Sequence, residues 1–158
     1  MVERNLIKEG FLYNTLTASG TVSGTQVVSL PQMNNILDGD TVSAALTVSG
    51  GKRIALTADL GARWRLSRLE YHSAETSISG VLFDISDDGV DFAQISTTLA
   101  GTLITGLIPD TTVSGSPRYV RLTHNASIAT DVFEWQALSK DTIVDFGTDG
   151  NQTEVEIS

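Results

Sequence analysis

The sequence contains no cysteine, only two histidines and three prolines. The lack of cysteine excludes a disulfide scaffold and a thiol nucleophile, although it does not fix the compartment. With so few histidines, the chain also lacks the usual ligands of the common metal hydrolases. The motifs Gly-x-Ser-x-Gly and His-Glu-x-x-His and a phosphate-binding loop are absent as well. We therefore expect a protein that is not an enzyme.

Long apolar runs and positive charge are scarce too. No apolar stretch approaches the roughly 20 residues of a membrane-spanning helix. The first ten residues hold no long apolar region, so we expect neither membrane insertion nor a secretory signal. Ten Lys and Arg face nineteen Asp and Glu, which gives a net charge of −9. A free nucleic-acid binder usually carries the opposite sign, so no nucleic-acid partner is expected.

The residues that are abundant indicate an all-β protein. The chain has 158 residues, of which 41% are hydrophobic, and this suits one globular domain with extensions. A core of that size needs neither a disulfide nor a metal to fold. Thr, Ser and Gly are frequent. Thr favours pleated surfaces, whereas Ser and Gly favour turns.

Strand-like alternation recurs along the chain and is clearest at residues 82–92. There, apolar Phe83 and Ile85 alternate with Asp84 and Ser86, and Asp87-Asp88-Gly89 follows as a tight turn. Further segments with strand character are 26–30, 46–48, 53–60, 66–72, 92–97, 103–107, 119–123 and 132–138. Such regular short strands predict a β-sandwich or jelly roll.

The two ends of the chain follow different patterns. Residues 1–24 lack a clean period and finish in a Ser- and Gly-rich joint, so they are predicted to form an arm outside a domain at residues 25–138. Within the extension 139–158, residues 142–146 and 153–157 alternate around a Gly-rich turn. This predicts a small hairpin, and because isolated hairpins are marginally stable, it should pack on the domain or on another chain.

Several motifs stand in a recognisable order along residues 25–138. They are Leu37-Asp38-Gly39-Asp40, Ala58-Asp59-Leu60-Gly61, Ile85-Ser86-Asp87-Asp88-Gly89-Val90-Asp91-Phe92, Arg118-Tyr119-Val120-Arg121-Leu122 and Val132-Phe133-Glu134-Trp135. This ordered set resembles the discoidin family, also called the F5/8 type C or galactose-binding-like domain. The resemblance implies a β-sandwich jelly roll of about eight antiparallel strands. It also implies a binding module, since many members bind carbohydrate and others bind lipid head groups or proteins.

The first of these motifs carries the possible cofactor. Many carbohydrate-binding relatives hold a structural Ca²⁺ in this loop, and the matching positions here are Asp38, Asp40, Ser43 and Glu134. The family often has a Thr and a Trp where this chain has Ser43 and Ala45. The alternative is that both aspartates stabilise an Asx-type turn and that Glu134 is solvated. No other cofactor is expected.

A sugar site needs an aromatic platform beside planar polar groups. The candidates are Arg63, Trp64, His72, His124 and Asn125. Trp64 follows the Asp-Leu-Gly turn and is expected to be exposed. The alternative is that Trp64 covers the sandwich edge and that both histidines are ordinary loop residues. Asp87, Asp88 and Asp91 do not match an EF-hand, and turn formation explains them better.

Two functions follow from these observations. The first is a structural or interaction protein of a phage virion, such as a capsid decoration, neck or tail protein. It would be located in the virion and would bind other virion proteins, or copies of itself, through its terminal arms. The small size, the expected lack of a secretion signal and the two extensions motivate this hypothesis. The alternative is a carbohydrate-binding module or adhesin that recognises a cell-surface glycan.

Overall fold

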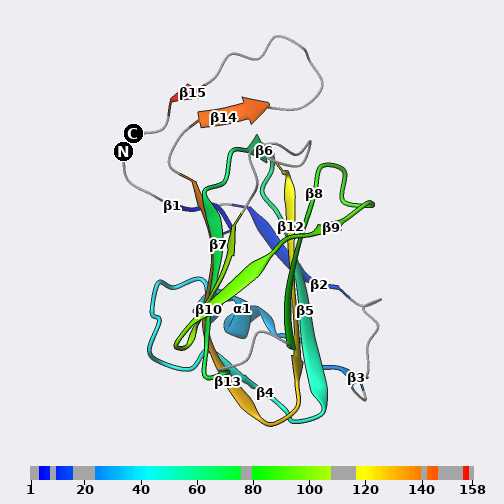
Figure 1. The fold of residues 1–158 in the computed structure, drawn as a ribbon, viewed down its shortest axis with the longest axis vertical. Helices are drawn as coiled ribbons and strands as arrows, with labels where there is room; N and C mark the ends of the chain where they lie inside the picture. The colour runs from blue at the N-terminus through cyan, green and yellow to red at the C-terminus, as the bar shows by residue number, and fades with distance from the viewer. Residues whose placement is uncertain are drawn as a thin grey trace.

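Two β-sheets face each other in the computed structural model, which describes residues 4–7, 10–15, 24–75, 80–107, 117–139, 142–145 and 155–156 (Figure 1). The first sheet has the order β1 (Arg4–Asn5), β13 (Thr130–Ser139), β7 (Arg68–Ser73), β11 (Leu103–Leu107) and β10 (Thr97–Ala100), with β4 (Leu46–Val48) also paired to β13. The second has the order β2 (Phe11–Asn14), β5 (Lys52–Asp59), β12 (Tyr119–Ala126), β8 (Val81–Ser86) and β9 (Ala93–Gln94), with β3 (Gly24–Thr25) also paired to β5. The predicted all-β sandwich is confirmed.

The core lies between the sheets and follows the predicted alternation. In β8, Val81, Phe83 and Ile85 are buried, and in β12 Val120 and Leu122 meet them on the same face. The pairs in both sheets are antiparallel, except that β3 runs parallel to β5. An antiparallel sheet with one face on the core leaves its other face to solvent, and the outer face of the second sheet therefore presents polar side chains.

A third, small sheet lies at one end of the sandwich, at the top of Figure 1. It has the order β15 (Val155–Glu156), β14 (Thr142–Asp145) and β6 (Arg63–Trp64). The pairs Thr142↔Glu156 and Ile143↔Val155 are those of an antiparallel hairpin, as predicted. Because β14 also pairs with β6, the hairpin docks on the domain.

The N-terminal segment belongs to the sandwich wherever it is described, so the prediction of an arm outside the core is wrong for these residues. Leu6 and Ile7 are each 1% exposed and lie in the core. β1 pairs with β13 of the first sheet, and β2 pairs with β5 of the second. The two strands are short and join different sheets, which is why residues 4–15 show no single period.

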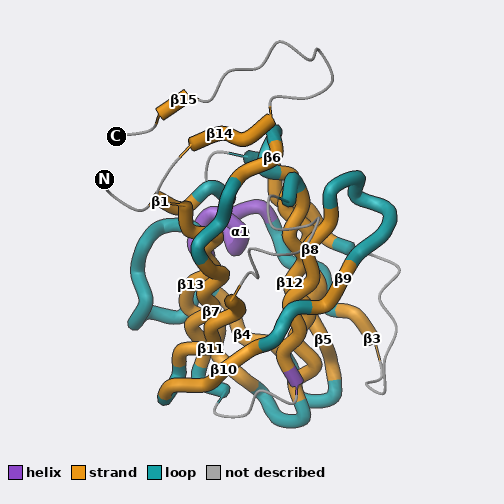
Figure 2. The backbone as a smooth tube through the Cα atoms, turned by 45° about the horizontal axis from the view of Figure 1, so that its top comes forward, coloured by secondary structure: helices purple, strands orange, loops and turns teal. Residues whose placement is uncertain are grey.

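The strand predicted at residues 26–30 is not formed: β3 ends at Thr25, residues 26–29 are irregular, and a short helix, α1 (Leu30–Ile36), begins at Leu30. The Ser29 hydroxyl accepts a hydrogen bond from the Gln32 amide, and the Gln32 side chain accepts one from the Ser29 amide. This capping box, together with Pro31 in the first turn, is a helix-start signal in the sequence itself. Met33 and Ile36 then bury the inner face of the helix. Figure 2 shows α1 as a short helix beside the strands, and no described helix is long and apolar enough to cross a membrane.

The chain changes sheets shortly after the β8–β9 turn. The predicted strand at residues 92–97 is therefore divided: Ala93–Gln94 pairs with β8, whereas Thr97 begins β10 in the first sheet. Ile95 marks the crossing, where its side chain enters the core. In the turn itself, Gly89 has φ +79°, and the Asp88 carboxylate accepts from the amides of Val90 and Asp91. The interpretation as a turn former is confirmed for Asp88, whereas the Asp87 carboxylate lies 3.7 Å from the Arg63 guanidinium.

Candidate functional site

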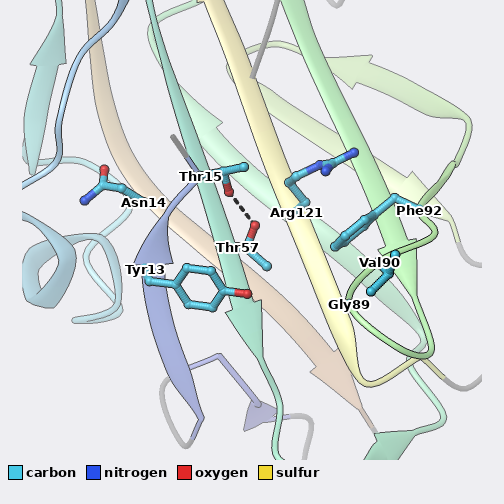
Figure 3. A pocket seen from close by; sticks show the side chains of 8 residues that line it. All are labelled: Tyr13, Asn14, Thr15, Thr57, Gly89, Val90, Phe92 and Arg121. Carbon is cyan, nitrogen blue, oxygen red and sulfur yellow. Dashed lines mark hydrogen bonds between the residues drawn. The ribbon is translucent and has the colours of Figure 1, made fainter. Parts of the chain in front are cut away.

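A pocket of about 330 Å³ opens on the outer face of the second sheet (Figure 3). Its lining comes from β2, β5, β12 and the loop between β8 and β9. The lining residues are Tyr13, Asn14, Thr15, Thr57, Gly89, Val90, Phe92 and Arg121. This volume lies at the lower end of the range in which proteins bind small ligands.

Strand register brings the floor of the pocket together. Tyr13 of β2 is opposite Thr57 of β5, and Thr57 is opposite Arg121 of β12, so all three point outward from one row of the sheet. The hydroxyls of Thr57 and Thr15 share a hydrogen bond, and the Thr15 amide donates to the Ala55 carbonyl over 2.8 Å. Figure 3 shows these hydroxyls between Tyr13 on one side and Phe92 and Val90 on the other.

An aromatic ring and a guanidinium form one wall. The Arg121 Cζ lies 4.0 Å from the centroid of the Phe92 ring, a cation–π contact. Nε of Arg121 also donates to Oδ2 of Asp84 over 3.3 Å. Asp84 and Arg121 are cross-strand neighbours on β8 and β12. The guanidinium is thus held by a ring face and by a carboxylate.

Tyr13 forms the opposite wall. Its ring centroid is 5.8 Å from that of Phe11, which is 67% exposed beside it. Burial raises the pKa of the Tyr13 hydroxyl, and the neighbouring Tyr119 and Asp59 raise it further. The hydroxyl therefore stays protonated at neutral pH, and it can both donate and accept a hydrogen bond.

A chain of contacts supports the loop that carries Val90 and Phe92. Asp59 accepts two hydrogen bonds from the Arg118 guanidinium, over 2.9 and 3.1 Å, and these lower the pKa of the carboxyl. The Cζ of Arg118 lies 5.3 Å from the centre of the Tyr119 ring. That ring packs against Gly89 so closely that a Cβ there would lie 3.0 Å from the Tyr119 Cζ. The Asp-Leu-Gly and Arg-Tyr-Val-Arg motifs therefore meet beneath one wall of the pocket.

The structure does not bring the five predicted sugar-site residues together. Trp64 is buried, with Nε1 donating to the Leu60 carbonyl over 3.2 Å, so the expectation that it is exposed is wrong. Trp64 belongs to the hydrophobic core, and the backbone of β6 pairs with β14, where Ile143 is opposite Trp64. Beside it, Arg63 lies 3.7 Å from the carboxylate of Asp87.

The other three candidates lie in three different parts of the fold. His72 faces outward from the first sheet, and its Nε2 lies 3.2 Å from Oε1 of Glu70. His124 lies inside the core, where its Nδ1 is 2.7 Å from the Tyr71 hydroxyl. Asn125 faces outward from the second sheet and accepts a hydrogen bond from Arg53 over 3.3 Å. The alternative of ordinary loop residues is also wrong for the two histidines, because both are on strands.

The four residues of the predicted calcium site lie in or beside one loop. The Asp38 carboxylate accepts from the Asp40 amide over 2.8 Å, and the Asp40 carboxylate accepts from the Val42 and Ser43 amides over 2.9 Å each. These contacts are Asx-type turns and lower the pKa of Asp40. Glu134 is buried rather than solvated, and its carboxylate accepts from the Gly39 amide over 3.0 Å.

These contacts account for the loop without a metal. In the part of the chain that the structure describes, no group of three or more acidic or histidine side chains could hold a metal ion. A calcium ion at this loop would therefore depend partly on backbone carbonyl oxygens. Calcium binding at this loop stays a prediction, and no part of the proposed function depends on it.

Comparison with known proteins gives the fold a context. No protein-family model matches the sequence, and no curated protein matches it. Among solved structures, a CBM32 module of Clostridium perfringens, CpGH89CBM32-6, aligns with a TM-score of 0.56 and 17% identity over 85% of this chain and 98% of its own. A mutant of chitosan-binding module 1 from a chitosanase/glucanase of Paenibacillus sp. IK-5 aligns with a TM-score of 0.59 and 13% identity over 87% of this chain and 100% of its own.

This chain has a discoidin-like, galactose-binding-like fold. A further similar structure, CpGH89CBM32-4 of Clostridium perfringens in complex with GlcNAc-α-1,4-galactose, aligns with a TM-score of 0.52 and 15% identity over 87% of this chain and 95% of its own. The resemblance seen in the ordered sequence motifs is thus confirmed at the level of the fold. At these identities the likeness does not extend to the ligand.

Proposed function

We propose that this protein is a non-catalytic carbohydrate-binding module and that the pocket on the second sheet is its sugar site. The observation that carries the proposal is the composition of the pocket: aromatic rings on two sides and hydroxyls on the floor. The fold, which similar sugar-binding modules share, supports it. The carbohydrate-binding module, which was the alternative in the sequence analysis, is thus preferred over the phage virion protein.

The chemistry of the lining suits a sugar ring. The C–H faces of a pyranose are apolar and pack on aromatic and aliphatic side chains, such as those of Tyr13, Phe92 and Val90. Its hydroxyls both donate and accept, as do the hydroxyls of Tyr13 and Thr57, whereas the side-chain amide of Asn14 is bonded to the backbone of Val28. The floor is already fixed by the hydrogen bond between Thr15 and Thr57, so a ligand orders few side chains on binding.

The lining also favours binding over catalysis. Glycoside hydrolysis ordinarily requires two carboxyl groups that flank the scissile bond. None of the eight residues that line this pocket carries a carboxyl group. The nearest paired carboxylate, Asp84, is bonded to Arg121. We therefore assign this pocket no hydrolytic step.

The virion location and the terminal-arm partners stay predictions from the sequence. The described N-terminal strands, β1 and β2, are used inside the sandwich, which removes one of the reasons for proposing gripping arms. The fold comparisons favour a module that binds sugar and do not favour a virion role.

The proposal is tested by titrating a panel of neutral, amino and acidic oligosaccharides into the intact chain by calorimetry. We expect binding to at least one sugar, and we expect Tyr13→Ala to weaken it at least about tenfold, because it removes one wall. Ile128→Ala is the matched control, since it also truncates an exposed apolar side chain, in the turn between β12 and β13. A chain that binds none of the sugars, or a Tyr13→Ala variant that binds like the parent, would contradict the proposal.

A further inference from the structure

We infer that the pocket discriminates by charge: it takes an uncharged sugar and rejects acidic ones, with Asp84 setting this preference. The inference rests on the proposed function, because it concerns the ligand class of the same pocket. Acidic sugars such as uronates are bound through cationic side chains, most effectively through the planar fork of an Arg. The question is therefore whether the pocket presents an available guanidinium.

Arg121 is the only charged residue among the eight that line the pocket, and its charge is already compensated. Its Nε donates to Oδ2 of Asp84 over 3.3 Å, and the ring of Phe92 covers its face at 4.0 Å. The side chains of Asp84 and Arg121 are only 14% and 28% exposed, so water screens this pair less than it would a surface pair. A ligand carboxylate that approached Arg121 would have to displace Asp84 or lie beside it.

The charges around the pocket point the same way. The second guanidinium in this region, that of Arg118, donates two hydrogen bonds to the carboxylate of Asp59. The loop that forms one wall adds two exposed carboxylates, Asp88 and Asp91. Two arginines thus face four aspartates, a local balance of −2, within a chain of net charge −9. A negative field of this kind lowers the encounter rate and the affinity of anionic ligands.

The pocket lining itself holds no carboxylate that could bind an amine. Two neighbouring carboxylates, Asp59 and Asp84, each accept a hydrogen bond from an arginine, and neither lines the cavity. The polar groups that line the pocket include the hydroxyls of Tyr13 and Thr57, and these complement uncharged sugar hydroxyls.

The test compares a neutral oligosaccharide with an oligouronate of equal length on the intact protein, by calorimetry at low and at high salt. The parent chain should bind the neutral sugar at least about tenfold more tightly than the uronate. Asp84→Asn keeps the shape of the side chain but uncovers the charge of Arg121. It should raise uronate affinity by about tenfold at low salt, lose much of that gain at high salt, and change neutral-sugar affinity by less than about twofold.

Two further variants separate local from global charge. Asp131→Asn removes one negative charge from β13 of the opposite sheet, and it should leave the uronate-to-neutral ratio as in the parent. Adding Arg121→Gln to Asp84→Asn should abolish the gain in uronate affinity. A parent chain that prefers the uronate, or an Asp84→Asn variant with an unchanged ratio, would overturn the inference and leave the proposed function standing. Failure to bind any sugar would overturn both.

Discussion

Acidification is expected to destabilise this protein through His124, whose imidazole lies between the two sheets. The residue is on β12 and its Nδ1 is 2.7 Å from the hydroxyl of Tyr71 on β7, so the pair joins the sheets across the core. The ring is fully buried, and among the described residues its Nε2 has no hydrogen-bond partner. Nε2 lies 4.0 Å from a carboxylate oxygen of Glu75, so we assign the proton of the neutral ring to Nε2, and Nδ1 then accepts from the tyrosine.

Burial is the main cause of the low pKa of the His124 imidazole. It lowers the pKa of His124 from 6.5 to about 4, and the nearby Glu75 carboxylate offsets only part of the effect. Above pH 6.5 the ring is neutral in the folded and unfolded chains alike, so stability is unaffected there. As the pH falls below 6.5, the unfolded chain binds a proton that the folded chain does not. The folded state therefore loses about 2 kcal/mol near pH 5 and about 3 kcal/mol below pH 4.

The measurement is urea unfolding near pH 7 and near pH 5, followed by the fluorescence of Trp64 and Trp135, which are both buried. His124→Asn keeps an oxygen that accepts from Tyr71 but cannot titrate. It should be less stable than the parent near pH 7, because it is smaller, and should lose about 2 kcal/mol less than the parent on going to pH 5. Carboxylates titrate in both proteins and cancel in this difference.

Two results would refute the reasoning. The first is an equal loss of stability in the parent and in His124→Asn between the two pH values. The second uses the unaltered chain and does not depend on the variant folding: nuclear magnetic resonance would show the His124 ring protons titrating near pH 6.5, as in an unfolded peptide, instead of near pH 4.

Three further predictions concern the N-terminal strands and the pocket wall. Leu6→Ala should cost about 2–5 kcal/mol in urea unfolding, because Leu6 is a core residue, whereas the exposed Val27→Ala should stay within about 0.5 kcal/mol; equal effects would contradict the assignment of residues 4–7 to the sandwich. Tyr119→Leu should weaken sugar binding about tenfold in calorimetry and Tyr119→Phe should restore it, since the ring supports the wall; unchanged binding in the leucine variant would argue against that support. Gly89→Ala should lower the free energy of unfolding by about 1–2 kcal/mol through backbone strain, and further through its clash with Tyr119. The loss should be larger than that of Gly101→Ala, where φ is also positive but nothing lies within 4 Å of an added Cβ. An equal loss in the two variants would exclude the clash.

Strands with a sustained period of two could be predicted from the sequence, and those without it could not. β5, β8 and β12 are long enough to show alternation, and their hydrophobic faces form the core as expected. β1 has two residues and β2 has four, too few to establish a period. Their partners lie elsewhere in the chain, so tertiary pairing decides their structure. The helix α1 could have been predicted from the sequence, because its capping box and proline are local signals.

The pocket was harder to predict because its parts meet only through strand register. Tyr13, Thr57 and Arg121 are far apart in the sequence and become neighbours only when β2, β5 and β12 pair. Trp64 was predicted to be exposed because it follows a glycine turn, but it is buried. Trp64 instead packs into the core, and its amide donates to the Pro117 carbonyl from a distant part of the chain. Local pattern therefore predicted turns and faces, whereas convergence and cover depended on topology.

The pairing of β1 with β13 also has a consequence for the order in which the chain folds. Arg4 is opposite Ser139, so β1 finds its partner only after all the residues between the two strands have been synthesised. Contacts between such distant residues slow folding, because a large loop must close before they form. Leu6 and Ile7, which belong to the core, therefore remain exposed during synthesis. We expect this segment to be the last part of the sandwich to dock and, in a nascent chain, the part most in need of protection from aggregation.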